Sequence, residues 1–155
     1  MIEIVIAGTG DHLSGIKTLF TEYAQIRNYD VALGDFQAEL LGLPGKYASP
    51  GGCLLLAQIG QQPAGCIAFQ PLEPGICEMK RMFVSPAFRG MGIGTALIES
   101  LLKEARNAGH KIMRLDTHPW MLQAHKLYLK AGFYEISRYN SNPTPGIRFF
   151  EKIID

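Results

Sequence analysis

The residues best placed for chemistry lie between Val84 and Thr95, in the stretch Val-Ser-Pro-Ala-Phe-Arg-Gly-Met-Gly-Ile-Gly-Thr. A predicted strand ends at Val84, a short loop follows, and glycines open a predicted helix. Glycines lack Cβ atoms, so a ligand can approach the backbone, and the free amides of a first helical turn attract anions. Arg89 adds a charge-assisted donor. The segment therefore predicts a site for a pyrophosphate.

The same glycines could also belong to other motifs. A Walker phosphate loop needs a lysine after its last glycine, and here Thr95 follows Gly94, so that motif fails. The third glycine of a Rossmann fingerprint would fall at Thr95, and five residues intervene after Val84. Asp116 does end the next predicted strand, where a ribose-binding acid belongs, so an NAD-dependent dehydrogenase stays open as an alternative. A turn that only packs a helix on a strand is the plainest alternative.

The segment resembles the acyl-coenzyme A binding motif of the GNAT superfamily of N-acetyltransferases, written [RQ]-x-x-G-x-[GA]. Arg89, Gly92 and Gly94 occupy its fixed positions. A second family motif, A-x-x-[LF]-Y-x-x-x-G-F, matches the stretch from Ala124 to Phe133. With both motifs in the expected order, and with the predicted elements in the family's order, the chain is identified as similar to GNAT enzymes.

The resemblance implies acetyl-CoA as the cosubstrate and the way in which it binds. No metal is expected, because His12, His110 and His125 show no metal-ligand spacing. In the family the sheet splays between the strand that here ends at Val84 and the one that here ends at Thr117, and the pantetheine arm lies in the gap. The cofactor contacts implied by position are Met82, Phe83, Val84, Arg89, Gly90, Met91, Gly92, Ile93, Gly94 and Thr95.

The implied reaction is attack of a neutral amine on a thioester carbonyl. A primary ammonium has a pKa of roughly 10, so a base is useful. The resemblance makes Glu78 the candidate base, because histone-type members carry a catalytic Glu at that offset before the motif arginine. On strand alternation Glu78 shares a face with Lys80, unless a bulge intervenes. The alternatives are a structural salt bridge to Lys80, Arg81 or Arg114, and deprotonation through a water chain.

The leaving thiolate needs a proton, and the resemblance gives that role to Tyr128. The alternative is a buried aromatic side chain with a satisfied hydroxyl. His118 follows a predicted strand near the expected substrate entrance, where it could shuttle protons or be a plain loop residue. Many relatives have an asparagine seven residues before the tyrosine, whereas this chain has Met121.

The acceptor pocket is expected between the segment Tyr23–Tyr47 and the loop Tyr139–Gly146. Acidic side chains there could attract an amine, and an arginine could meet a carboxylate. The residues concerned in the first segment are Tyr23, Arg27, Tyr29, Asp30, Asp35, Glu39 and Tyr47.

The elements that must position these residues follow from hydrophobic periodicity and turn signals. Strands are predicted at 2–7, 53–59, 64–70, 76–84, 112–117, 133–137 and 147–153. Helices are predicted from Asp11 through Tyr23, over 35–43, 93–108 and 122–130. This order predicts an α/β (α+β) fold with a mixed, mostly antiparallel central sheet, splayed at the cofactor site and flanked by about four helices.

Length and composition limit the remaining choices. The 155 residues predict one domain, 1–155, and 47% hydrophobic residues support a globular core. The net charge of +1 predicts no nucleic-acid partner, and the absence of a long apolar run predicts no membrane partner. Residues 76–155 have a net charge of +5 against −4 for 1–75, which suits an anionic ligand. Three cysteines without a CxxC pattern predict a reducing, cytoplasmic setting and no zinc site.

Together these observations predict an acetyl-CoA-dependent N-acetyltransferase acting on a primary amine of a small molecule, by direct attack in a ternary complex. A protein N-terminal or lysine acetyltransferase and a non-catalytic acyl-CoA sensor are the rivals. A homodimer is compatible with the family.

Overall fold

The structure is a computed structural model that describes residues 1–26 and 34–154. Its helices and strands follow the order predicted from the sequence. In chain order they are β1 (Ile2–Ile6), α1 (Gly10–Ile26), α2 (Gly34–Gly42), β2 (Cys53–Ile59), β3 (Gln62–Glu73), β4 (Ile76–Val84), α3 (Ile93–Asn107), β5 (Ile112–Thr117), α4 (Leu122–Lys130), β6 (Tyr134–Ile136) and β7 (Arg148–Ile153).

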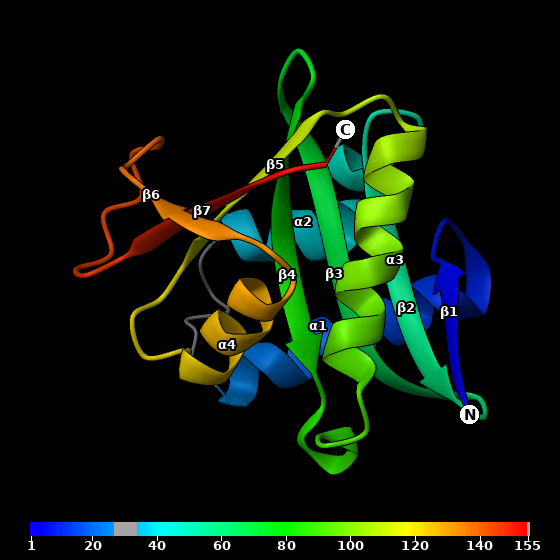
Figure 1. The fold of residues 1–155 in the computed structure, drawn as a ribbon. Coiled ribbons are helices and arrows are strands. Elements are labelled where there is room, and N and C mark those ends of the chain that lie inside the picture. The colour runs from blue at the N-terminus through cyan, green and yellow to red at the C-terminus, as the bar shows by residue number, and fades with distance from the viewer. Residues whose placement is uncertain (27–33, 155) are drawn as a thin grey trace.

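The strands form one mixed sheet in the order β1-β2-β3-β4-β5-β7-β6. β1, β2, β3 and β4 are successive antiparallel neighbours. Short turns join β2 to β3 and β3 to β4, whereas helices lie between β1 and β2 in the chain. The β4–β5 pair is parallel, as the helical crossover through α3 requires. The predicted mixed, mostly antiparallel sheet is therefore confirmed (Figure 1).

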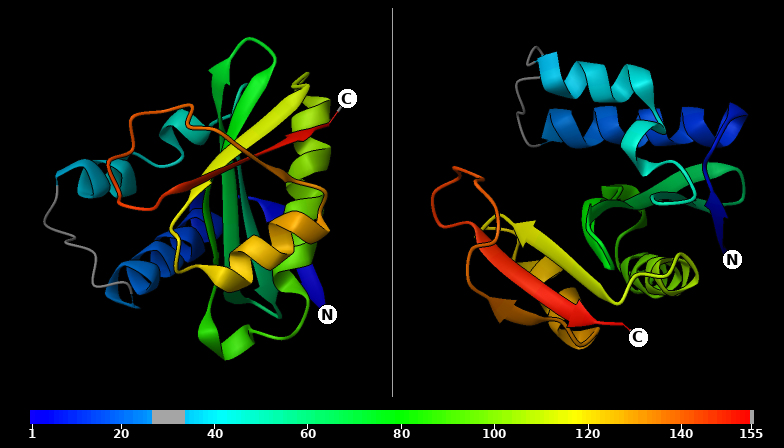
Figure 2. Two further views of the ribbon diagram at one scale, coloured as in Figure 1. Left: turned by 60° about the vertical axis from the view of Figure 1, so that its left-hand side comes forward. Right: turned by 90° about the horizontal axis from the view of Figure 1, so that it is seen from above.

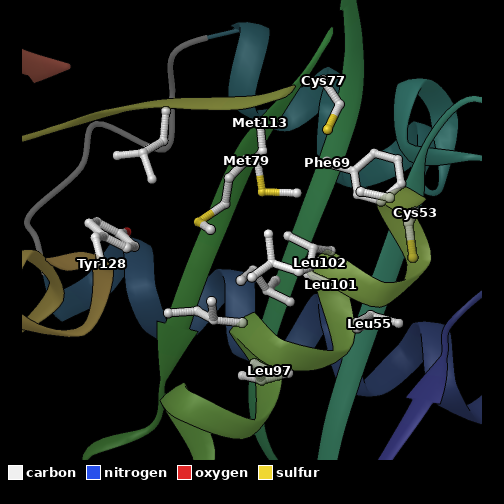
Figure 3. Packing of buried hydrophobic residues seen from close by; sticks show 14 of the residues in the cluster. Cys53, Leu55, Phe69, Cys77, Met79, Leu97, Leu101, Leu102, Met113 and Tyr128 are labelled. Atoms are coloured by element: carbon white, nitrogen blue, oxygen red, sulfur yellow. The ribbon is translucent and has the colours of Figure 1, made fainter. Parts of the chain in front are cut away.

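Helices cover both faces of this sheet. α1 and α2 lie on one face, and α3 and α4 lie on the other (Figures 1 and 2). This explains the unbroken apolar run of β2, because a strand buried on both faces needs no polar alternation. Leu55 packs into the core under α3, while its neighbours Leu54 and Leu56 pack into the core under α1. Figure 3 shows Leu55 in the same buried cluster as Leu97 and Leu101 of α3.

The parallel pair β4–β5 separates soon after it begins. Its register covers only 76–78 of β4 and 112–114 of β5, although both strands continue toward Val84 and Thr117. The splay implied by the family resemblance is therefore present, and it opens at the carboxyl ends of the two strands (Figure 1).

β4 also carries a bulge. Lys80 pairs with Ala68, and Phe83 pairs with Cys66, so two residues of β4, Arg81 and Met82, oppose one residue of β3. Because side chains alternate along a strand, the extra residue reverses the faces that follow. Met79 and Met82 pack against the core under α3, and Phe83 belongs to the core under α1.

Several boundaries differ from the predicted ones. β3 is longer than the predicted 64–70, because pairing with β4 continues past Pro71. The proline is tolerated there because β2 pairs with β3 only as far as Phe69, so no donor is required on that side. Short 3-10 turns form at Gly45–Tyr47 and at Pro86–Phe88, the second within the predicted loop. None of the described helices has the length and apolar character needed to cross a bilayer.

Candidate active site

A cavity of about 620 Å³ lies beside the start of α3, and we call it the glycine-loop cavity. All but one of the residues predicted to bind the cofactor line it. The exception is Met91, whose side chain is half exposed. The lining residues are Tyr23, Met82, Phe83, Val84, Phe88, Arg89, Gly90, Gly92, Ile93, Gly94, Thr95, Trp120, Met121, Leu122, Gln123, Ala124, Lys126 and Leu127.

The backbone at the start of α3 offers amides to this cavity. Gly92 is the N-cap of the helix, with a φ of 82° that L-residues with side chains rarely adopt. The carbonyl of Gly92 accepts the amide of Ala96, so the amides of the first turn before it have no partner within the helix. Such a turn is suited to bind an anion, and the exposed Arg89 adds a positive charge to the same wall.

Gly94 allows a close approach of three elements at the cavity wall. A Cβ atom at Gly94 would lie 2.8 Å from Cδ1 of Leu127 in α4 and 3.1 Å from Cε of Met82 in β4. The absence of a side chain therefore lets α3 pack near both walls of the splay.

A second cavity of about 150 Å³, the polar cavity, shares Tyr23, Met82 and Met121 with the first. It lies at the splay, between β4 and β5. Its lining residues are Tyr23, Met79, Lys80, Arg81, Met82, Leu115, Asp116, Thr117, His118, Met121, Tyr128 and Asn142. The two cavities are therefore adjacent at Tyr23, Met82 and Met121.

Tyr128 projects from α4 toward the splay (Figure 3) and lines the polar cavity. Only 4% of the residue is exposed, and among the described residues its hydroxyl has no hydrogen-bond partner. Burial raises the pKa of the Tyr128 phenol, and the nearby Tyr23 and Asp116 raise it further. The hydroxyl is therefore protonated at neutral pH and able to donate into the cavity, which differs from the alternative of a satisfied core tyrosine.

Asp116 brings a carboxylate to the wall of the polar cavity. Its Oδ2 accepts hydrogen bonds from Nδ2 of Asn140 at 2.7 Å and from Nδ2 of Asn142 at 3.3 Å. Nζ of Lys80 lies 3.7 Å from its Oδ1. These contacts fix the carboxylate while its side chain keeps 11% of its surface exposed.

Glu78 lies deeper and outside the residues that line either cavity. Its carboxylate accepts hydrogen bonds from the Tyr139 hydroxyl at 2.5 Å, from Gln70 at 2.9 Å and from Asn140 at 3.4 Å. Lys80 lies 3.6 Å away, which is the salt bridge that the sequence offered as the alternative to a catalytic role. Asn140 and Lys80 both contact Asp116 as well, so the two carboxylates belong to one network.

His118, which follows β5, is held through its backbone carbonyl, which accepts a hydrogen bond from His125. Arg148 can only donate to Nδ1 of His125, at 3.2 Å, so Nε2 carries the hydrogen and donates to the carbonyl of His118 at 3.0 Å. Burial lowers the pKa of His125, and the charge of Arg148 lowers it further. The ring of His118 stacks on Trp120 with centroids 4.8 Å apart and lines the polar cavity.

The segment expected to shape the acceptor pocket is described only in part. Tyr23 lines both cavities, but Tyr47 is buried, with 1% exposed, and donates to Glu39. Glu39 in turn pairs with Arg81. The predictions for Arg27, Tyr29, Asp30 and the Asp35 side chain lie outside the described residues. From the loop after β6, Asn142 reaches the polar cavity.

Among the described residues no group of histidine, cysteine, aspartate and glutamate could hold a metal ion. Cys53, Cys66 and Cys77 are free and buried, and burial raises the pKa of each thiol to about 12. None of the three lines either cavity.

From the sequence, Asp116 is expected only as the ribose-binding acid of the dehydrogenase alternative, and Lys80 only as a neighbour or salt-bridge partner of Glu78; neither is predicted to line an acceptor cavity. A signal was available, because charged residues recur at alternate positions in both predicted strands, Glu78 and Lys80 in one and Arg114 and Asp116 in the next. Parallel neighbours bring such residues onto a common face. The contacts of Asn140 and Asn142, more than 20 residues away in the chain, had no such signal.

Comparison with known proteins agrees with this geometry. Residues 16–133 match the family model described as "Acetyltransferase (GNAT) family". An uncharacterised N-acetyltransferase of Schizosaccharomyces pombe is 35% identical over 137 residues, which cover 87% of this chain and 84% of that protein. Among solved structures, a GNAT-family acetyltransferase from Staphylococcus aureus has a TM-score of 0.84 at 22% identity, with each chain fully covered.

A PaiA N-acetyltransferase from Thermoplasma acidophilum, solved in complex with coenzyme A, has a TM-score of 0.76 at 16% identity, with 99% of each chain covered. Both structures share the fold of this chain. The family match, from Ile16 in α1 to the end of the second motif at Phe133, includes every lining residue of the two cavities except Asn142, which lies in the loop between β6 and β7. The chain therefore belongs to the GNAT family of acetyltransferases.

Proposed function

We propose that the protein transfers an acetyl group from acetyl-CoA to a primary amine of a small molecule, by direct attack within a ternary complex. The observation that supports this most is the meeting of two unlike cavities at Met82 and Met121, with the Tyr128 hydroxyl in the polar one. One cavity suits a long anionic ligand and the other a small polar acceptor.

The residues of the glycine-loop cavity fit coenzyme A. The first-turn amides of α3 and Arg89 would hold the pyrophosphate, and the backbone of 82–84 would contact the pantetheine arm. Bound acetyl-CoA supplies an activated thioester. Backbone amides near Met82, which lines both cavities, would stabilise negative charge on the carbonyl oxygen.

Proton transfers are assigned to two sides of the polar cavity. Tyr128 donates the proton that the departing sulfur needs, because its raised pKa keeps it protonated. The carboxylate network of Asp116 and Glu78 accepts the proton of the amine. Within this network Asp116 lines the cavity, and Glu78 is connected to it through Asn140 and Lys80.

The size of the polar cavity supports a small acceptor. Its volume of about 150 Å³ is that of a single small metabolite, well below the range of about 300–1,000 Å³ typical of drug-sized ligands. The free, buried cysteines suit the reducing cytoplasm predicted from the sequence.

The first test is isothermal titration with acetyl-CoA, using NAD as the control ligand. We expect binding of acetyl-CoA alone, followed by free-thiol release when a panel of small amines and amino acids is added. Absence of acetyl-CoA binding by the folded protein would refute the proposal. Binding without turnover on any amine would favour the sensor, and turnover only on peptides would favour the protein acetyltransferase.

A further inference from the structure

The bulge in β4 decides which side chains reach the glycine-loop cavity. Before the bulge, Lys80 lies on the face of Glu78 and Asp116, while Met79 is buried under α3. Uninterrupted alternation would continue this pattern and put Met82 on the face of Lys80. The extra residue reverses it, so Met82 packs under α3 and lines the glycine-loop cavity.

The conformation that makes the bulge is unfavourable for the residue that adopts it. Among the non-glycine residues that the structure describes, Arg81 alone has a positive φ, at 59°. In this left-handed region a side chain crowds its own backbone, so glycine is the usual occupant of such a bulge. Arg81 therefore needs support from its surroundings to remain in this state.

Glu39 of α2 provides that support from 42 residues away in the chain. Its carboxylate receives two hydrogen bonds from Arg81, Nε to Oε2 at 2.6 Å and Nη2 to Oε1 at 2.9 Å. The Tyr47 hydroxyl donates to the same carboxylate at 3.1 Å, and Lys46 lies 3.4 Å from it. The Phe36 ring lies 5.9 Å from the Arg81 guanidinium, so α2 contacts this side chain at two places.

The lowered pKa of Glu39 is consistent with an ionised carboxylate paired with Arg81. Burial alone raises the pKa of its carboxyl, but the hydrogen bonds and charge of Arg81 outweigh burial and hold the pKa below the usual value. The carboxyl oxygens are satisfied by partners on β4 and on the turn after α2. The backbone of Arg81 is also held on its other side, where the Cys66 thiol donates to its carbonyl at 3.3 Å.

We infer that Glu39 is a positioning residue for acyl-CoA: its pairing with Arg81 maintains the β4 bulge and thereby keeps Met82 and the backbone of 82–84 aimed into the glycine-loop cavity. This inference rests on the proposed function. It links a residue of α2, which lines neither cavity, to the affinity for the cosubstrate.

The test compares Arg81→Ala with Arg81→Gly by isothermal titration with acetyl-CoA. Both variants lose the side chain and one positive charge, but only glycine adopts the left-handed conformation without cost. We expect Arg81→Ala to weaken acetyl-CoA binding about tenfold, and Arg81→Gly to stay within about threefold of the wild type. Arg106→Ala, on the exposed last turn of α3, removes the same charge elsewhere and should leave the affinity unchanged.

Glu39→Gln provides a second, independent arm, which stands even if Arg81→Ala fails to fold. Glu39→Gln should weaken acetyl-CoA binding in the wild-type background and have no further effect in Arg81→Gly, where the bulge no longer needs the pair. A merely structural pair would lower the unfolding midpoint and leave the dissociation constant unchanged.

Two results would overturn the inference: equal losses of affinity in Arg81→Ala and Arg81→Gly, or unchanged affinity in Glu39→Gln. Failure of the wild type to bind acetyl-CoA would instead refute the proposed function, and the inference with it.

Discussion

The glycine at the start of α3 allows a sharp test of the anion site, because the other end of the same helix offers a matched control. Gly92 and Gly109 have φ values of 82° and 89°, and a Cβ atom at either would meet nothing within 4 Å. Gly92→Ala and Gly109→Ala therefore impose the same backbone penalty without a steric clash. Only Gly92 lines the glycine-loop cavity.

The penalty for alanine in the left-handed region is about 1–2 kcal/mol. At Gly109 all of it should appear as lost stability, which for a chain of 155 residues corresponds to a fall in Tm of about 2–8 °C. In Gly92→Ala without ligand, the loop can relax to another conformation. Acetyl-CoA binding must then restore the conformation that presents the first-turn amides of α3 to the cavity. The part of this penalty that does not lower the stability of Gly92→Ala should instead weaken acetyl-CoA binding, by at most about 5- to 30-fold.

Thermal melts and isothermal titration of the two variants separate these effects. We expect Gly109→Ala to have wild-type affinity and a lowered Tm, and Gly92→Ala to have weakened affinity. If Gly92→Ala bound acetyl-CoA as tightly as Gly109→Ala, the left-handed cap would not be part of the anion site.

Three further predictions concern the polar cavity and its support. Asp116→Asn should lower kcat by about 100-fold or more with an accepted amine, and Glu78→Gln should lower it less; the reverse order would move the proton acceptor to Glu78. Tyr128→Phe should lower kcat while the acetyl-CoA dissociation constant is kept, and because burial raises the pKa of Tyr128, the wild-type kcat should show no alkaline fall with an apparent pKa of 10 or below. Because the pKa of His125 is lowered in the folded protein, the unfolded chain binds a proton at this histidine more readily than the folded protein does. Wild-type stability in urea should therefore fall as the pH drops below about 6.5. His125→Asn should show a smaller fall in stability from about pH 7 to about 5.5.

Elements with strong local signals could be predicted from the sequence. The bounds of β4, β5 and α4 agree with the predicted ranges, because each is an apolar-periodic run closed by a turn or a glycine such as Gly132. The glycine-loop cavity was also predictable, since ten of its lining residues come from the single stretch 82–95. Local patterns were enough wherever a site is built from consecutive residues.

The parts that could not be predicted depend on contacts between distant residues. Asn140 reaches Asp116 across 24 positions, and Arg81 reaches Glu39 across 42. Sequence periodicity does not indicate such long-range pairs. The family resemblance indicated Glu78, but in the folded chain this residue bonds to Tyr139 and Gln70 and lies behind the cavity wall. A bulge was considered between Glu78 and Lys80, but its place at Arg81 could not be predicted, because arginine lacks the glycine signal that usually marks a left-handed residue.

β4 therefore lines two chemically different cavities, and its bulge allows one strand to direct a charged and an apolar side chain to different faces. An unbroken β4 would put Lys80 and Met82 on one face, so that a charged and an apolar side chain would compete for one environment. The reversal at Arg81 sends Lys80 toward the carboxylates of the acceptor side and Met82 under α3, toward the glycine loop. The splay begins only a few residues earlier, after Glu78, so strand separation and face reversal occur in the same part of β4. Both cavities meet at Met82 as a result, and loss of the bulge should impair acyl-CoA binding and acceptor binding together.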